Sequence, residues 1–317
     1  MSWTNNTYTE YKWYELCGNS AHQYLAEECK NTIVYNCHGY DYNKYYCRLL
    51  GSDFLIPINK GEEYKLTDLY FHKLRYGFYR CKITGNKKFR KIFTYNPKNV
   101  YLKEYVEYAY KHRKEYEVVI ELIVDGDYNA LLYKPRDMVP ISSITKDWFE
   151  FMMKINKEFN ENGTKNELFK MIASTTWGNM SETNTINVDE DDLDNYDIGD
   201  ENHEYSINEE IVSKKKHYFE LINNMEPYKF NLRLKPFVTC TGRIKIADTM
   251  IKAGIDNVFR VHSDGIVLYK PFNFDDLTIW DEGKTTGDIH WLNNNDYKNI
   301  HDEKYPKWLK KNNIEED

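Results

Sequence analysis

Two strand-like segments, far apart along the chain, each present an aspartate at one end. Residues 32–41 (TIVYNCHGYD) are rich in β-branched and aromatic side chains and end at Asp41. Residues 258–269 (VFRVHSDGIVLY) predict a β-hairpin with Asp264 in its Ser-Asp-Gly tip. Because most of the chain separates the two aspartates, only the tertiary fold can bring them together.

A pair of carboxylates at adjacent strand ends is what a two-metal phosphoryl-transfer site requires. Two Mg²⁺ ions about 4 Å apart need bridging oxygen ligands, so that one ion activates a hydroxyl and the other holds a triphosphate. Each aspartate alone is equally typical of a turn residue or a helix cap. The same pair would also serve hydrolysis in a two-metal nuclease, so the carboxylates leave both reactions open.

A third element lies between the two aspartates. Residues 166–178 (NELFKMIASTTWG) predict a helix that ends at Gly178, where a C-terminal glycine is expected. Lys170, Ser174 and Trp177 recur at i, i+4 and i+7 and therefore share one helix face. A lysine near a hydroxyl and an indole suits contact with a triphosphate and a base pair. The alternative is a surface lysine above a buried tryptophan.

Taken in order, these elements resemble the motifs of family B DNA polymerases, in particular viral or plasmid members, some of them protein-primed. YDYNKYY (residues 40–46) resembles DxxSLYP, and KMIASTTWG (170–178) resembles KxxxNSxYG. HSDGI (262–266) resembles DTDSI, and TGRIKIADTM (241–250) resembles the arginine-containing helix that precedes it in the family. The resemblance spans roughly residues 15–292, and three motifs in the family's order form a specific signal.

The resemblance implies an α+β palm, an antiparallel sheet backed by helices, with a helical fingers insertion. It implies a template-directed DNA polymerase that adds dNTPs to a primer 3′ end. The implied site consists of metal ligands (catalytic Asp41 and Asp264, with the backbone carbonyl of Tyr42), nucleotide-binding residues (Tyr42, Lys44, Tyr45, Tyr46, Lys154, Lys157, Lys170, Ser174 and Trp177), primer-end contacts (His262 and Ser263) and structural residues (Gly178 and Arg243). Tyr46 stands at the steric gate, where an aromatic ring beneath the sugar leaves no room for a ribose 2′-hydroxyl. For Lys154, pairing with Glu150 one turn away is an equal alternative.

The implied cofactor is Mg²⁺, as two ions that Mn²⁺ could replace, and the implied partners are primer–template DNA and dNTPs. No exonuclease motif is recognisable before Asp41. We therefore expect proofreading from a separate subunit, or a split or reduced polymerase. A terminal protein or a processivity partner is a further expectation.

Several positions depart from the family pattern. His262 replaces the first aspartate of the third motif, and Lys44, Tyr45 and Cys47 replace serine, leucine and proline of the first. Ser174 replaces an asparagine of the second motif. His262, Lys44 and the short thumb favour an alternative, a catalytically reduced palm module that binds nucleic acid or a replication partner. The retention of Asp41, Tyr46, Lys170 and Asp264 opposes it.

The motifs predict four regions along the chain. They are a lead-in with the first part of the palm (1–96), a fingers region (97–180), an acidic insertion with the second part of the palm (181–292) and a short thumb remnant or tail (293–317). We expect residues 1–30 to be mainly helical and residues 179–210 to form a mobile loop or insertion.

Charge is distributed unevenly, although the net charge is −7. Residues 171–213 contain 12 acidic residues and no Lys or Arg, whereas residues 60–114 contain 15 basic and 5 acidic residues. Attraction to phosphates depends on such local fields, but a solvated basic face would have the same composition. With no apolar run of about 20 residues and no secretory signal, we expect a soluble intracellular protein without a membrane partner, located in the host cytoplasm or nucleus if it is viral.

Overall fold

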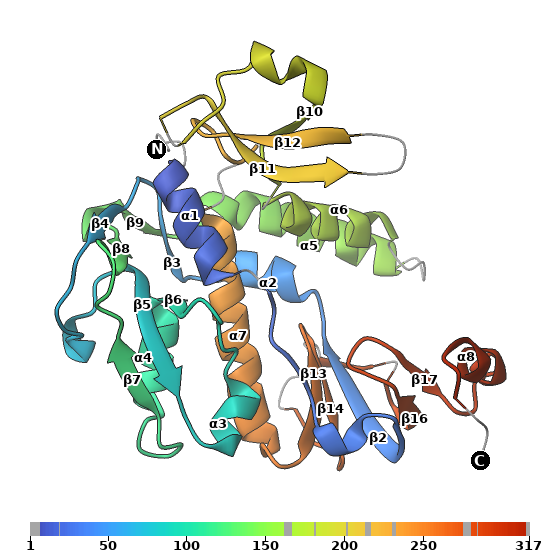
Figure 1. The fold of residues 1–317 in the computed structure, drawn as a ribbon. Helices are drawn as coiled ribbons and strands as arrows, with labels where there is room; N and C mark the ends of the chain where they lie inside the picture. The colour runs from blue at the N-terminus through green and yellow to red at the C-terminus, as the bar shows by residue number, and fades with distance from the viewer. Residues whose placement is uncertain are drawn as a thin grey trace.

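The computed structural model describes most of the chain, namely residues 7–18, 20–161, 167–180, 182–200, 202–212, 217–229, 233–274, 280–283 and 285–314. Within these residues it is a mixed α/β protein in which the strand pairs of all four sheets are antiparallel. Helix α7 stands between a five-stranded sheet on one side and the central sheet on the other (Figure 1).

The central sheet contains both of the strand-like segments that carry the aspartates. Its strands are β1 (Gln23–Leu25), β2 (Thr32–Tyr42), β13 (Val258–His262), β14 (Gly265–Leu268), β15 (Trp280–Glu282), β16 (Gly287–Trp291) and β17 (Tyr297–Asn299). They are ordered β1-β13-β14-β2-β16-β17, and β15 also pairs with β2. The predicted hairpin at 258–269 is confirmed as β13 and β14, and the predicted strand at 32–41 as β2.

One continuous hydrophobic core joins the two large sheets through helix α7 (Leu234–Ala253). Phe237, Ile246 and Met250 of the helix are buried together with Val261 and Ile266 of the central sheet. Burial of each such side chain contributes about 1.5–3 kcal/mol. Gly254 follows the last helical residue and has a φ of 86°, a conformation that glycine adopts without steric cost because it has no Cβ. The predicted helix at 242–253 is therefore confirmed, although it begins earlier, at Leu234.

The second large sheet has five strands, and all of them come from residues 62–132, which follow β2 in the sequence. Its strands are β4 (Glu62–Tyr64), β5 (Gly77–Thr84), β6 (Val100–Leu102), β7 (Val119–Leu122) and β8 (Ala130–Leu132), accompanied by α3 (Lys87–Ile92), α4 (Lys103–Lys111) and the pair β3 (Leu55–Pro57) and β9 (Met138–Pro140). Residues 97–140, the first part of the predicted fingers region (97–180), contain helix α4 together with strands β6, β7, β8 and β9. Alternating buried apolar residues place β5 at the centre of this sheet.

Two long helices follow, α5 (Ser142–Glu161) and α6 (Glu167–Asn179). They pack on α2 (Tyr45–Leu50), the short helix that follows β2, through a cluster of Cys47, Met152 and Phe169. The helix predicted to end at Gly178 ends one residue later, at Asn179. The polypeptide directly after Asp41 is therefore held against this helical pair.

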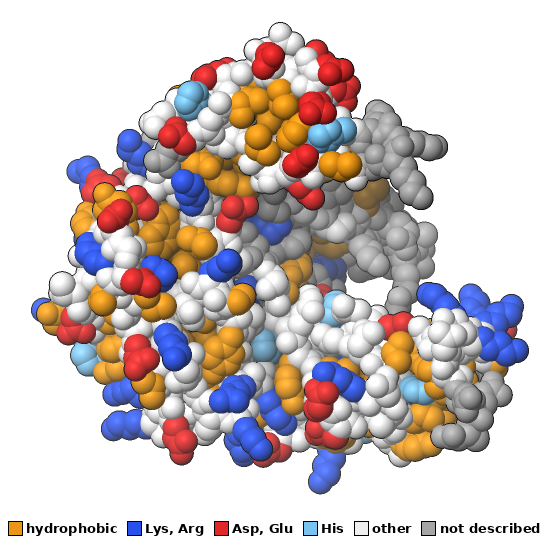
Figure 2. All heavy atoms as spheres, viewed as in Figure 1, with side chains coloured by type: hydrophobic (Ala, Val, Ile, Leu, Met, Phe, Trp, Pro, Cys, Tyr) orange, Lys and Arg blue, Asp and Glu red, His pale blue; other side chains and the backbone are white. Residues whose placement is uncertain are grey.

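The acidic segment, predicted as a mobile loop or insertion, is folded where the structure describes it; a mobile loop is therefore wrong for these residues, and an insertion stays a prediction. Its described residues form a three-stranded sheet of β10 (Thr185–Asp189), β11 (Tyr205–Val212) and β12 (His217–Asn223) with a short 3₁₀-helix (Glu190–Asn195). Acidic side chains gather over this sheet at the top of Figure 2. Val188, Leu221 and Ile222 are buried, whereas Ile207 and Val212 are exposed. Strand pairing and these few buried apolar side chains therefore suffice to order a sequence of acidic composition.

The two ends of the described chain are short helices. Helix α1 (Tyr8–Cys17) is tied to the start of α7 by a fully buried ion pair, in which Arg233 Nη2 lies 2.7 Å from Glu10 Oε2. The segment after it was predicted to be helical but instead forms β1 and a 3₁₀-turn (Glu27–Cys29). Near the C-terminus, α8 (Tyr305–Lys311) packs beside β17. Within the described residues, no helix is both long enough and apolar enough to cross a membrane.

Candidate functional site

The structure brings Asp41 and Asp264 to the same point of the central sheet. Strand β14 pairs with β2 in a register that sets Gly265 opposite Asp41. The backbone N–H of Tyr42 donates a 2.9 Å hydrogen bond to the carbonyl oxygen of Asp264. Ser263 precedes Asp264 in the two-residue turn and adopts a left-handed φ of 59°. Asp41 therefore lies in β2 and Asp264 in the turn that leads into the neighbouring strand β14, and a backbone hydrogen bond joins the two segments directly.

The two carboxylates repel each other. Burial and, to a smaller extent, the nearby Asp41 carboxylate raise the pKa of Asp264 to about 6, although a hydrogen bond from its own backbone N–H partly opposes both effects. Asp41 lies exposed at the end of its strand. A half-buried carboxylate beside a second one is a site whose negative charge a bound cation would compensate.

Two glycines make room for the Asp41 carboxylate. A Cβ on Gly265 would lie 2.6 Å from Asp41 Oδ1, and a Cβ on Gly283 would lie 3.2 Å from Asp41 Oδ2. Any larger residue would thus have to displace the carboxylate. The sequence analysis included Gly265 only as part of a motif and missed Gly283, because the strand contacts between residues 39–42 and 280–283 are not visible in the sequence.

The residues directly after Asp41 differ strongly in exposure. The Tyr42 ring is buried edge-on against Tyr45 and Trp280, with ring centroids 5.2 and 5.0 Å away. Tyr45 is also buried, and its hydroxyl donates a 2.5 Å hydrogen bond to the carbonyl oxygen of Gly242 on α7. Contact of these two residues with a nucleotide would therefore have to come from their backbone.

Tyr46 remains partly accessible beside Asp264. Burial raises the pKa of the Tyr46 hydroxyl, and the Asp264 carboxylate raises it further, whereas a hydrogen bond with the Ser263 side chain lowers it. The Tyr46 ring packs edge-on against Tyr45 at 5.3 Å. A small recess behind Tyr46 is lined by Ala21, His22, Tyr45, Tyr46, Thr239, Gly242, Arg243 and Ser263. The tyrosine predicted to select the sugar thus lies next to one of the two carboxylates.

His262 and Arg243, the predicted primer-end contact and structural residue, differ in burial and in their neighbours. Burial lowers the pKa of His262, and the neighbouring Arg260 lowers it further. Arg243 is buried, and its Nε donates a 2.8 Å hydrogen bond to the carbonyl oxygen of Ser20. Arg243 therefore supports the backbone near the site.

The predicted triphosphate-binding residues lie on the α5–α6 pair and after Asp41. Lys154 is exposed and forms an ion pair at 3.9 Å with Glu158 rather than Glu150, which pairs with Lys146. Lys157 and Gly178 are exposed, and exposed Ser174 donates a 3.0 Å hydrogen bond to the carbonyl of Met171. Lys44 has a left-handed backbone, and its Nζ lies 6.0 Å from the centroid of the Phe169 ring on α6. The side chains of Lys170 and Trp177 lie outside the described residues.

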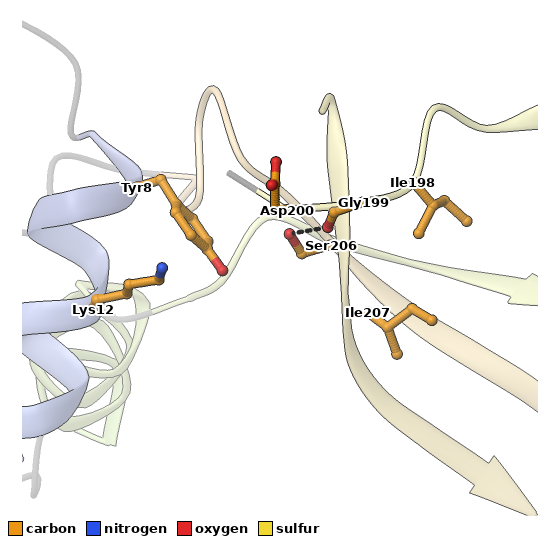
Figure 3. A pocket seen from close by; sticks show the side chains of 7 residues that line it. All are labelled: Tyr8, Lys12, Ile198, Gly199, Asp200, Ser206 and Ile207. Atoms are coloured by element: carbon orange, nitrogen blue, oxygen red, sulfur yellow. Dashed lines mark hydrogen bonds between the residues drawn. The ribbon is translucent and has the colours of Figure 1, made fainter. Parts of the chain in front are cut away.

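The larger recesses of the molecule lie elsewhere. One of about 560 Å³ lies between α1 and the acidic sheet and is lined by Tyr8, Lys12, Ile198, Gly199, Asp200, Ser206 and Ile207 (Figure 3). Within it, Lys12 Nζ lies 4.5 Å from the centroid of the Tyr8 ring, and Ser206 Oγ donates a 3.0 Å hydrogen bond to the carbonyl of Gly199. It lies apart from both aspartates, so the paired carboxylates remain the stronger candidate site.

The residues at the carboxylate pair fit Mg²⁺. Across the part of the chain that the structure describes, no three His, Cys, Asp or Glu side chains are grouped to hold a metal ion. Mg²⁺ does not need such a cage, since it is commonly bound by one or two carboxylates together with water and substrate phosphates. Asp41 and Asp264 supply that hard-oxygen donor set.

No protein-family model matches the sequence, and no curated protein matches it. Solved structures of Phi29 DNA polymerase do match. The binary complex with primer–template DNA is 14% identical with a TM-score of 0.59, covering 92% of this chain and 49% of that one. The ternary complex with primer–template DNA and incoming nucleotides is 13% identical with a TM-score of 0.60, covering 93% and 51%.

The chain is folded like one half of Phi29 DNA polymerase. At this low sequence identity, the similarity establishes the polymerase-like fold and does not by itself establish activity. The chain spans about half the length of that polymerase. Any statement about its reaction must therefore come from its own residues.

Proposed function

We propose that this chain is a template-directed DNA polymerase of the family B type, which adds dNTPs to a primer 3′ end. The observation that carries the proposal is the meeting of Asp41 in β2 with Asp264 in the adjacent β13–β14 turn, with Tyr46 beside them. The polymerase-like fold supports it independently, because the matched structures contain primer–template DNA and nucleotides. In this proposal the central sheet with α7 is the palm and the α5–α6 pair belongs to the fingers.

Asp41 and Asp264 would hold the metal ions, together with the backbone carbonyl of Tyr42. When bound, two Mg²⁺ ions, or Mn²⁺ in their place, would activate the primer 3′-hydroxyl and stabilise the charge of the triphosphate. The protein's own contribution is the fixed spacing of two carboxylates, which costs no reorganisation when the substrates arrive. Gly265 and Gly283 maintain that spacing by leaving the Asp41 carboxylate in place.

The side chains around the carboxylates would orient the substrates. Tyr46 would lie beneath the sugar and exclude a ribose 2′-hydroxyl. Lysines of the helical pair, Lys154, Lys157 and Lys170, would approach the triphosphate when the helices close, and the ion pair of Lys154 with Glu158 would exchange for phosphate contacts. His262 and Ser263 would contact the primer end. A terminal protein, a processivity partner and a separate exonuclease subunit are further proposed partners.

Primer extension tests the proposal. A labelled primer–template is incubated with dNTPs and Mg²⁺ and either wild-type protein or an Asp41→Ala, Asp264→Ala double variant. Template-directed extension by the wild type alone is the expected result. DNA binding without extension would instead favour the reduced module, which the replacement of a carboxylate by His262 independently favours. Shortening of the primer would favour a nuclease.

A further inference from the structure

A short segment, residues 20–25, lies between the helices and the hairpin that carries Asp264; we call it the strap. From α7, Arg243 Nε donates its 2.8 Å hydrogen bond to the carbonyl of Ser20. At the other end, β1 pairs with β13 in a register that sets Gln23 opposite His262. The strap therefore connects the helical layer to the strand that leads directly into the Ser263–Asp264 turn.

This turn is bonded on both sides. The backbone N–H of Ser263 donates a 3.0 Å hydrogen bond to the carbonyl of His22, and the carbonyl of Asp264 accepts the 2.9 Å bond from Tyr42 N–H. Ser263 has the left-handed φ of 59°, a conformation that non-glycine residues adopt only when their surroundings fix it. The position of Asp264 therefore depends on His22 on one side and on the strand of Asp41 on the other.

The His22 side chain is itself held at both ring nitrogens. It is only 3% exposed; its Nδ1 lies 2.7 Å from Thr94 Oγ1 and its Nε2 lies 2.7 Å from the carbonyl oxygen of Lys91. Because a carbonyl only accepts, Nε2 must carry the hydrogen, and Nδ1 accepts from the Thr94 hydroxyl. These two bonds anchor the strap to the end of α3 and the residues after it.

We infer that His22 is a positioning residue that fixes Asp264 relative to Asp41 by anchoring the strap through Thr94 and Lys91. The expected effect of His22 on primer extension rests on the proposed function, whereas its expected effect on the rigidity of the turn does not. Phosphoryl transfer depends mainly on placement of the reacting groups, and a displacement of about 1 Å can lower a rate by about 100-fold. None of these bonds reaches either carboxylate, so His22 would act on Asp264 through the strap and the turn.

Two variants test this inference, one by removing both hydrogen bonds of the His22 ring and the other by removing only one. His22→Phe keeps an aromatic ring and removes both ring hydrogen bonds, whereas Thr94→Val keeps the shape of residue 94 and removes only its hydroxyl. His22→Gln restores a donor toward Lys91 and is the conservative rescue. The matched control is His290→Phe, because His290 is also buried in the central sheet and bonds through Nδ1 to the Tyr305 hydroxyl at 2.8 Å, away from the turn.

The first readout is amide hydrogen exchange of residues 258–269 in the metal-free, full-length protein. Exchange at the turn is expected to be at least about tenfold faster in His22→Phe, intermediate in Thr94→Val and His22→Gln, and unchanged in His290→Phe. The second readout is single-turnover extension at saturating dNTP, together with primer–template affinity. The extension rate of His22→Phe is expected to fall by about 10- to 100-fold, with the Kd for DNA within twofold of wild type.

Unchanged exchange in a folded His22→Phe or Thr94→Val variant would overturn the inference. So would equal changes in His22→Phe and His290→Phe, since they would show a general loss of packing. Normal extension by His22→Phe would also overturn it. If the wild type does not extend primers while exchange responds as expected, the proposed function fails and the positioning role stands.

Discussion

Replacing Asp264 with asparagine should make the metal-free protein more stable and inactive. The pKa of Asp264 is raised from 3.8 to about 6, chiefly by burial and then by Asp41. Because the folded pKa lies above the unfolded one, the associated stabilisation is fully present below about pH 3.8 and is lost as pH rises to about 6. At pH 8 the ionised carboxylate therefore costs about 3 kcal/mol relative to its protonated form.

Asparagine removes the charge but weakens the hydrogen bond that the carboxylate accepts from its own backbone N–H. We therefore expect a net gain of about 1–2 kcal/mol in the free energy of unfolding at pH 8. The assay is denaturant unfolding in EDTA at pH 4, 6 and 8, followed by addition of Mg²⁺. The gain should shrink toward zero at pH 4, and Mg²⁺ should stabilise the wild type more than the variant.

A suitable control is Asp256→Asn at an exposed site. The hydrogen bond with Lys88 lowers the pKa of Asp256, so its charged form contributes stability that is lost as the pH falls, the opposite sign. That variant should gain nothing at pH 8. The reasoning is refuted if Asp264→Asn is no more stable than wild type at pH 8, or if its advantage is the same at pH 4.

Three further changes have defined outcomes. Tyr46→Ala should raise ribonucleotide incorporation by about 10- to 100-fold in a competition assay, and unchanged sugar selectivity would remove Tyr46 from the gate. Gly265→Ala places a Cβ 2.6 Å from Asp41 Oδ1, so extension should fall at least about tenfold while DNA affinity holds; full activity would show that the carboxylate has room to move. Glu10→Gln leaves Arg233 buried without its charged partner and should cost about 3–5 kcal/mol in denaturant unfolding, whereas a loss below about 1 kcal/mol would contradict the burial of this pair.

The parts of the fold that the sequence predicts are those with strong local signals. The strand ending at Asp41 and the hairpin around Asp264 have β-branched and aromatic runs bounded by turn residues, and both are present. The end of α7 is marked by Gly254, whose positive φ suits glycine. The sequence analysis placed the two aspartates together because of their chemistry. The strand register, which sets Gly265 opposite Asp41, gives this inference a structural basis.

The parts that the sequence did not predict depend on tertiary contacts or on misleading composition. Acidic residues in 182–229 concealed three paired strands that bury only a few apolar side chains. The three residues Gln23–Leu25 are too few to show a strand pattern in the sequence, and they were predicted to be helical. Their pairing with β13 makes them a strand. His22 could not have been identified, because its ring partners lie about 70 residues away in sequence.

The position of β2 in the central sheet also has a consequence for how the protein is made. Its described neighbours β14, β15 and β16 all come from residues after 264, so both edges of β2 stay open while most of the chain is being synthesised. Contacts between such distant segments form slowly, and open strand edges favour aggregation. The central strand therefore remains unprotected until residues 265–291 have emerged from the ribosome, and a nascent chain stalled before residue 258 should depend strongly on chaperones.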